Sequence, residues 1–322
     1  MSEESLLQLK DLQVNIGKTP VVRGVSFDLR AGESLGIVGE SGCGKSVTAL
    51  SIMRLLPQPP MHIESGDVLF EGQNLTQLPE RQLERIRGRE IAMIFQEPMS
   101  SLNPVFSVGD QVSEVLYLHE GLRKNSARQK RNELFDKVGL SANRIADRFP
   151  HQLSGGQRQR VMIAMSLACN PKMLIADEPT TALDVTVQAQ ILELLDQLRA
   201  DMGMAILLIA HDLGVVRYHC DQVAVMYAGK IVESGLTEQV FNSPSHPYTR
   251  ALLETIPAVN ARGKPLPSID GSVPSSAHLP QGCSFEPRCR FSQDQCVRQT
   301  PELKHQFPSD HHVSCWYPVT AP

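Results

Sequence analysis

The chain has 322 residues, 41% of them hydrophobic and 20% charged, so it can bury one large core and still carry a smaller second unit. Its formal net charge of −4 lacks the basic excess typical of a dedicated nucleic-acid binder, so we expect no nucleic acid among its partners. The sequence contains no long uninterrupted apolar run and begins with acidic residues, which argues against a membrane-spanning helix and a secretory signal. We therefore expect a cytoplasmic protein that reaches a membrane only through partner subunits.

The N-terminal part of the chain has the pattern of β-strands. Apolar and polar residues alternate over residues 6–30, and the segment Gly17–Pro20 supplies a turn between the two halves. Another strand pair with turn residues is predicted around Gly66–Gly72. These segments predict a small antiparallel sheet.

A phosphate-binding pattern lies between these strand pairs. The apolar run Ser34–Gly39 is typical of a buried strand, and residues 47–56 suit a helix that prolines then stop. Between them, the pattern G-x-x-x-x-G-K-S is formed by Gly39, Glu40, Ser41, Gly42, Cys43, Gly44, Lys45 and Ser46. In such a loop backbone N–H groups surround an anion, Lys45 neutralises the outer phosphates, and the Ser46 hydroxyl can ligate Mg²⁺. The sequence therefore predicts a nucleotide site.

The middle of the chain changes from strands to polar helices. The apolar strand Ile91–Phe95 ends at Gln96, and prolines with charged helical segments then predict a helical subdomain over about residues 97–165. Within it, the sequence Leu-Ser-Gly-Gly-Gln at 153–157 opens a helix with Ser154 as its N-cap. The two glycines expose backbone donors at that helix start.

Strands and helices alternate again after this helix. The strand that follows it ends in two acidic residues, Asp177 and Glu178, and a later strand ends at His211. Strands are predicted at 172–177, 205–210, 222–227 and 231–233, and a helix at 185–202. This alternation predicts an α/β domain over residues 1–240, with a mostly parallel sheet covered by helices on both faces.

Taken in order, these motifs resemble the nucleotide-binding subunit of ATP-binding-cassette (ABC) transporters, whose fold is that of the P-loop NTPases. The resemblance implies that ATP and Mg²⁺ bind here. Asp177 would hold Mg²⁺ together with Ser46 and Gln96, and Glu178 would activate the attacking water as general base. His211 would contact the γ-phosphate, and Gln96 would also relay the state of the site to a membrane partner.

The resemblance also implies a second ABC ATPase subunit. In this family the signature loop closes over ATP that the opposed subunit holds, and group members often pair as heterodimers. The signature residues are Ser154, Gly155, Gly156 and Gln157. Asp184 would connect the two sites, and a single chain is expected to be a poor ATPase. Ile16 stands where the family often has an aromatic residue that stacks on adenine, so the choice of ATP rests on the resemblance alone.

The last part of the chain, residues 241–322, is predicted to be a C-terminal extension that is irregular and proline-rich from about Pro257. Its segment Ser243–Arg250 resembles one found in oligopeptide, dipeptide and nickel importer ATPases. This implies two transmembrane permease subunits, an extracytoplasmic solute-binding protein, and a peripheral position on the cytoplasmic face of the inner membrane. Uptake of di- and oligopeptides is favoured. Alternatives are a nickel, metal-chelate or glutathione importer and, less favoured, an ABC ATPase without a transport role.

Four cysteines are concentrated in this extension. They are Cys283, Cys289, Cys296 and Cys315, with the spacing C-x₅-C-x₆-C-x₁₈-C. In a reducing cytosol such a cluster suggests metal ligands more than disulfides, and by count it suits zinc and an iron–sulfur cluster equally. The resemblance to dipeptide-importer subunits favours a [4Fe-4S] cluster, with zinc and unmetallated thiols as alternatives.

Overall fold

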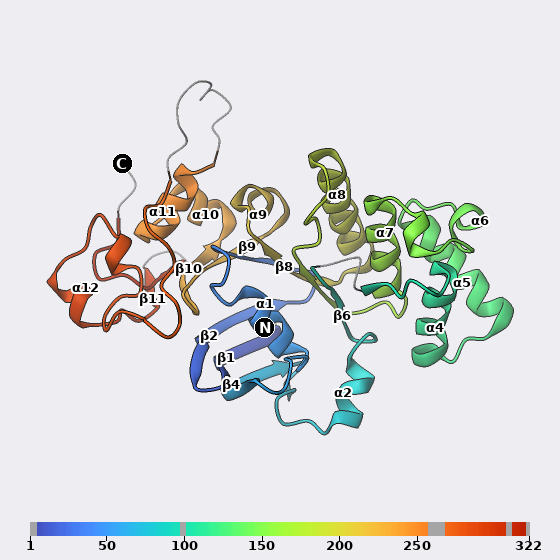
Figure 1. The fold of residues 1–322 in the computed structure, drawn as a ribbon, viewed down its shortest axis with the longest axis horizontal. Coiled ribbons are helices and arrows are strands. Elements are labelled where there is room, and N and C mark those ends of the chain that lie inside the picture. Colours follow the sequence, from blue (N-terminus) through green and yellow to red (C-terminus); the bar gives the residue numbers. More distant parts are fainter. Residues whose placement is uncertain (1–4, 97–100, 257–267, 307–310, 320–322) are drawn as a thin grey trace. The chain divides into compact units, whose positions relative to one another are not determined.

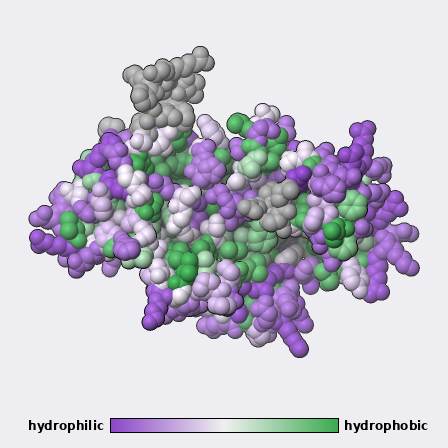
Figure 2. Space-filling model, viewed as in Figure 1, coloured by the Kyte–Doolittle hydropathy of each residue, from purple (hydrophilic) through white to green (hydrophobic). Residues whose placement is uncertain are grey.

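The computed structural model describes residues 5–96, 101–256, 268–306 and 311–319 (Figure 1). The chain forms two compact units: the first comprises Met1–Leu29, Ser34–Thr76 and Leu208–Pro322, and the second Arg30–Glu33 and Gln77–Leu207. The starts of the predicted insertion (97–100) and of the irregular tail (257–267) lie outside the described residues. Among the helices that are described, none is long and apolar enough to cross a bilayer. On the face drawn in Figure 2, hydrophobic residues form small separate patches between hydrophilic ones.

The first unit contains the predicted antiparallel sheet. Its strands are β1 (Ser5–Ile16), β2 (Thr19–Arg30), β4 (Met61–Phe70) and β5 (Gln73–Asn74), in the order β2-β1-β4-β5. Leu7, Leu9 and Leu12 of β1 are buried. Gly66 lies opposite an irregularity in the β1–β4 register, where a Cβ would lie 2.4 Å from the Asp11 carbonyl oxygen. Glycine is therefore required at this close approach of two strands.

A second sheet in this unit contains β3 and most of the C-terminal strands. The sheet has eight described strands, and this unit contributes β3 (Ser34–Val38), β9 (Gln222–Tyr227), β10 (Lys230–Leu236), β12 (His311–Val313) and β11 (Lys304–Gln306) to it. β3 and β9 are parallel, whereas β10 is antiparallel to both β9 and β12. The prediction of an irregular tail was therefore incomplete, because β12 pairs with β10. A three-residue strand is too short to show periodicity in the sequence.

Among the described residues of the first unit, six helices accompany these strands. They are α1 (Lys45–Ile52), α9 (Leu213–His219), α10 (Thr237–Asn242), α11 (Pro247–Glu254), the 3₁₀ helix η2 (Glu286–Arg288) and α12 (Asp294–Arg298). The predicted helix over 47–56 was too long at its C-terminal end. α1 ends at Ile52, and Arg54 then adopts a left-handed conformation with φ 49°, which no α-helix can contain.

Glu233 of β10 holds the C-terminal segments in place. Its carboxylate is fully buried and accepts hydrogen bonds from the backbone N–H groups of Ser245 (2.6 Å) and His246 (2.9 Å). Nε2 of His311, in β12, lies 2.7 Å from the same carboxylate. One buried side chain thus joins three segments that the sequence separates.

Replacing Glu233 by alanine is expected to lower the free energy of unfolding by about 3 kcal/mol, because it leaves two buried N–H donors and His311 without their acceptor. Glu238→Ala, at an exposed position on α10, is the matched control and should change it by less than about 0.5 kcal/mol. Urea unfolding followed by circular dichroism measures both. Equal stability of the two variants would show that the Glu233 network contributes nothing.

The second unit combines a parallel strand pair with a set of helices. The strands β6 (Ile91–Ile94) and β7 (Met173–Asp177) are parallel, and all five residues of β7 are buried. The helices are α2 (Glu80–Ile86), α4 (Val108–Glu120), α5 (Lys124–Lys137), α6 (Ala142–Ile145), η1 (Pro150–Gln152), α7 (Gly155–Ser166) and α8 (Val185–Met202). The helical insertion is confirmed, and α7 has Ser154 as its N-cap, as predicted. β8 (Ala205–Ala210) leads from this unit into the first one.

Candidate nucleotide site

The predicted phosphate loop connects β3 to α1 in the first unit. Three of its residues, Gly39, Gly42 and Gly44, have positive φ angles of 153°, 80° and 105°. A Cβ at Gly39 would lie 2.1 Å from the carbonyl oxygen of Met226, and one at Gly44 would lie 3.2 Å from that of Val21. Glycine is therefore required both by the backbone conformation and by the neighbouring strands.

Lys45 is the cation of this loop. Only 5% of the residue is exposed, and its Nζ donates hydrogen bonds to the carbonyl oxygens of Gly39 (2.7 Å) and Glu40 (3.2 Å). The ammonium group is thus fixed across the loop by backbone acceptors. A buried positive charge in a loop of this kind is suited to binding phosphate oxygens.

The remaining loop residues differ in exposure. Ser41 is exposed, Ser46 is half-buried, and Cys43 is fully buried. Burial raises the pKa of the Cys43 thiol, with Lys45 opposing this shift, and so favours the neutral thiol over the reactive thiolate.

The two acidic residues predicted at the strand end lie in the second unit. Asp177 is the last residue of β7 and is buried, and Glu178 follows it with φ 46°. Nε2 of Gln96 donates to Oε2 of Glu178 at 2.8 Å, and the Thr181 hydroxyl donates to the same oxygen at 3.1 Å. The structure therefore brings Gln96 and Glu178 together and holds the carboxylate with two donors. Left-handed backbone at a non-glycine residue is costly and is found preferentially at functional sites.

Thr181 was missed by the sequence analysis. The signal available was its position three residues after Glu178, which suits a side-chain contact across a tight turn. A threonine in such a place is common in ordinary turns, so the sequence alone did not single it out.

The signature residues form the start of α7. Ser154 is its N-cap: the hydroxyl accepts from the Gln157 N–H at 3.3 Å, and Oε1 of Gln157 accepts from the Ser154 N–H at 3.1 Å. This reciprocal pair is a capping box. Ser154 and Gly155 are exposed. The loop therefore presents a preorganised helix N-terminus at the surface of its unit.

The start of α8 packs against this signature loop. A Cβ built at Gly155 would lie 3.0 Å from a methyl group of Leu183, and one at Gly156 would lie 2.8 Å from a methyl group of Val187. Asp184 is the N-cap of α8 and accepts from the Val187 N–H at 2.9 Å. Asp184 thus has a local structural task besides the role that the resemblance implies.

His211 belongs to the first unit, directly after β8. It is exposed, and the next residue, Asp212, is the N-cap of α9, accepting from the Gly214 N–H at 2.7 Å. This cap fixes the backbone on the C-terminal side of His211.

The four cysteines of the extension line one small pocket, called the cysteine pocket here, together with Phe285, Phe291 and Trp316. Burial raises the pKa of the thiols of Cys283, Cys289 and Cys315, that of Cys315 to about 12. Within the part of the chain that the structure describes, no group of three or more His, Cys, Asp or Glu side chains could hold a metal ion. The metal site predicted from the cysteines therefore stays a prediction.

Two segments of the sequence match known protein families. Residues 22–181 match the family described as ABC transporter, and residues 232–296 match the oligopeptide/dipeptide transporter C-terminal region. The oligopeptide transport ATP-binding protein OppD of Bacillus subtilis is 47% identical over 97% of this chain and 88% of its own length. The chain belongs to the oligopeptide/dipeptide ABC transporter family, as an ATP-binding subunit.

Other relatives agree with this ABC assignment. OppD of Haemophilus influenzae is 48% identical over 97% of both chains. Among solved structures, a dimeric ATP-binding cassette bound to ADP and inorganic phosphate is 28% identical, with a TM-score of 0.64 over 72% of this chain and 98% of that one. The cbiO1 protein of Clostridium perfringens, part of an ABC transporter complex, is 29% identical, with a TM-score of 0.65 over 74% of this chain and 91% of that one. These neighbours confirm the predicted ABC fold.

Proposed function

We propose that this chain hydrolyses ATP to power the uptake of di- and oligopeptides through partner permease subunits. The observation that carries the proposal is the hydrogen bond of 2.8 Å between Gln96 and Glu178, at the end of the buried strand β7. A carboxylate fixed by Gln96 and Thr181 is oriented to accept a proton from an attacking water. The names of the close relatives, which are oligopeptide transport proteins, support the peptide cargo.

The site residues have distinct roles in this proposal. The loop from Gly39 to Ser46 binds the phosphates of ATP, and Lys45 stabilises the charge that develops on them. Asp177, Ser46 and Gln96 offer the hard oxygen ligands that Mg²⁺ prefers. His211 contacts the γ-phosphate. When bound, the metal ion neutralises the phosphate charge that these residues alone cannot balance.

A second ABC subunit completes each site. Support comes from the exposed Ser154 and Gly155 at the N-terminus of α7, since backbone donors at a helix start are suited to bind phosphate. These residues act on ATP held by the opposed subunit, which we propose to be a non-identical one. ATP binding draws the two subunits together and pulls on two permease subunits at the cytoplasmic face of the membrane, while an extracytoplasmic binding protein selects the cargo.

Hydrolysis in the assembled transporter tests this proposal. In vesicles that contain this chain, its partner ATPase and the permeases, ATP hydrolysis and peptide uptake are expected to rise when the peptide-loaded binding protein is added. Lys45→Ala in this chain should abolish uptake, because the phosphates lose their buried cation. A response to nickel chelates or glutathione with none to peptides would contradict the peptide cargo, and uptake unaffected by Lys45→Ala would contradict the ATPase role.

The cysteine pocket is proposed to hold a [4Fe-4S] cluster. Support comes from four thiols that line one pocket with an apolar wall, as cysteine-ligated clusters require. The preference for a cluster over zinc rests on the resemblance to dipeptide-importer subunits.

Iron analysis tests this part of the proposal. The chain purified without oxygen is expected to carry about four iron atoms and to absorb broadly in the visible range. Cys296→Ser should lose most of the iron, whereas Cys169→Ser, whose thiol lies outside the cysteine pocket, should keep it. One equivalent of zinc would indicate the alternative ion, and a metal-free chain after anaerobic purification would contradict both.

A further inference from the structure

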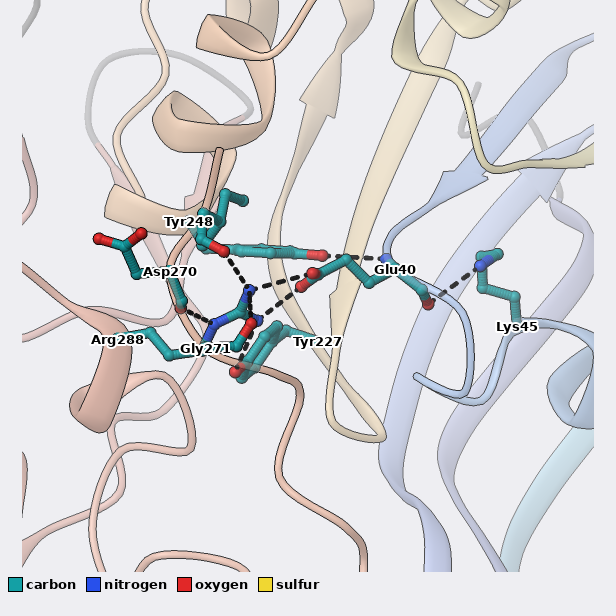
Figure 3. Close-up of polar contacts among 8 residues, drawn as sticks. Glu40, Lys45, Tyr227, Tyr248, Asp270, Gly271 and Arg288 are labelled. Carbon is teal, nitrogen blue, oxygen red and sulfur yellow. Dashed lines mark hydrogen bonds and ion pairs between the residues drawn. The ribbon is translucent and has the colours of Figure 1, made fainter. Parts of the chain in front are cut away.

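The C-terminal extension contacts the phosphate loop through Arg288, which ends η2 and directly precedes Cys289. The two terminal nitrogens of its guanidinium donate to the two carboxylate oxygens of Glu40, at 2.7 Å and 3.0 Å (Figure 3). The Arg288 side chain is only 4% exposed, against 30% for that of Glu40. These hydrogen bonds to Glu40 raise the pKa of Arg288 above its usual value. This is a bidentate ion pair shielded from water, which is far stronger than an exposed one.

The guanidinium is oriented by further acceptors of the extension. Nε of Arg288 donates to the Asp270 carbonyl oxygen at 2.8 Å, and one terminal nitrogen donates to the Ile269 carbonyl oxygen at 3.3 Å. The other terminal nitrogen reaches the hydroxyl of Tyr227 at 3.3 Å, as Figure 3 shows. These acceptors, from the extension and from β9, hold the guanidinium in the orientation in which it pairs with Glu40.

Tyr248 holds the backbone of the same loop residue. Its hydroxyl accepts a hydrogen bond of 3.0 Å from the Glu40 N–H. The tyrosine is fully buried, and its ring packs on those of Tyr227 and Phe285 at centroid distances of 4.6 Å and 5.3 Å. Both the side chain and the amide of Glu40 are thus fixed by residues more than 200 positions away in the sequence.

This arrangement also affects the charge at the site. Glu40 lies in a loop that is suited to bind a triphosphate, and an unpaired carboxylate there would repel the anion. Arg288 neutralises that charge and holds the carboxylate toward the extension. The Tyr248 hydroxyl accepts a hydrogen bond from the Glu40 N–H. That N–H group is then not available to an anion, and the other N–H groups of the loop determine the geometry of anion binding.

We infer that the C-terminal extension is part of the nucleotide site, with Arg288 and Tyr248 as positioning residues that hold Glu40 and so set the charge and shape of the phosphate loop. This inference rests on the proposed function, because it assumes that the loop binds ATP. The extension then contributes to ATP binding as well as to any role of the cysteine pocket.

Titration of the full-length chain with a fluorescent ATP analogue tests this inference. Arg288→Ala is expected to weaken binding about tenfold, because the carboxylate of Glu40 is left unpaired near the phosphates. Tyr248→Phe, which keeps the ring and loses only the hydroxyl, should weaken it about threefold. Arg290→Ala, at an exposed position two residues away, is the matched control and should bind like the wild type.

The Glu40→Gln substitution separates a direct effect on the loop from general loss of stability. In the Arg288→Ala background it is expected to restore most of the lost affinity, since it removes the charge that Arg288 neutralised. Thermal unfolding of the same variants shows whether the affinity merely follows the stability, since a role in ATP binding requires an affinity loss in Arg288→Ala under conditions where that variant is fully folded. Wild-type affinity in Arg288→Ala, or a double variant as weak as Arg288→Ala, would overturn the inference.

Two further results complete the design. If Arg288→Ala does not fold, Arg288→Lys takes its place: it keeps the charge but loses the bidentate geometry, and an intermediate affinity is expected. Wild-type affinity in both Arg288→Lys and Tyr248→Phe would then overturn the inference. Failure of the proposed function looks different, because the wild-type chain itself would then bind no ATP analogue.

Discussion

Glu178→Gln is expected to reduce ATP hydrolysis by the assembled transporter about a thousandfold while leaving ATP binding intact. Glutamine keeps the size of the side chain, and its carbonyl oxygen can still accept from Gln96 and Thr181, whose hydrogen bonds now hold the carboxylate. It cannot, however, take a proton from the attacking water. Radiolabelled phosphate release measures hydrolysis, and retention of labelled ATP measures binding.

The loss of hydrolysis in Glu178→Gln is specific only if replacing an exposed carboxylate elsewhere in the unit leaves hydrolysis unchanged. Glu193→Gln, at an exposed position on α8 in the same unit, is the matched control and should hydrolyse ATP at the wild-type rate. Gln96→Ala should hydrolyse ATP at a rate between those of these two variants, because Glu178 then still accepts the hydrogen bond from the Thr181 hydroxyl. Wild-type hydrolysis in Glu178→Gln would remove Glu178 from its proposed role as general base.

The regular elements of this fold could be predicted because their signals are local. α8 was predicted with its observed bounds, Val185–Met202, since it has an N-cap aspartate, one apolar face and a glycine at its C-terminal end. β8 and β9 were also predicted with their observed bounds, because strands that are buried on both faces have continuous runs of apolar residues. α1 was predicted too long, since apolar residues continue after the helix has ended.

The rest depended on contacts that no local pattern encodes. Glu40 and Arg288 lie 248 positions apart, and a charged residue in either segment is ordinarily exposed. The pairing of β12 with β10 rests on two register pairs and on the buried Glu233. Glu178 likewise adopts a left-handed conformation that glutamate itself does not favour, so no local propensity predicts it.

Gly155→Asp is the second substitution for which we expect a large effect, and it separates stability from activity. An aspartate in the first turn of α7 interacts favourably with the helix dipole, so the melting temperature should be unchanged or slightly higher. In the proposed arrangement the same negative charge would face the γ-phosphate of the ATP held by the opposed subunit, so hydrolysis at that site should fall by about a hundredfold or more. Thermal unfolding and phosphate release measure the two effects.

Steric change needs its own control. Gly155→Ala adds the same Cβ, which would lie 3.0 Å from the end of the Leu183 side chain, a flexible neighbour that can move by a few tenths of an ångström. The alanine variant should therefore keep much more activity than the aspartate variant. If both lose hydrolysis equally, packing and not charge explains the effect.

Mixing two inactive variants shows which chain the signature loop serves. When this chain with Lys45→Ala pairs with a partner ATPase that carries aspartate at the glycine corresponding to Gly155, one composite site receives both defects and the other receives none, whereas Lys45→Ala and its equivalent in both subunits damage both sites. Partial recovery of hydrolysis is therefore expected in mixed dimers, identified by two different affinity tags. If each nucleotide were served by a single chain, every site would carry a defect and no activity would return. Mixed dimers that form but stay inactive would thus contradict a signature loop acting on the opposed subunit.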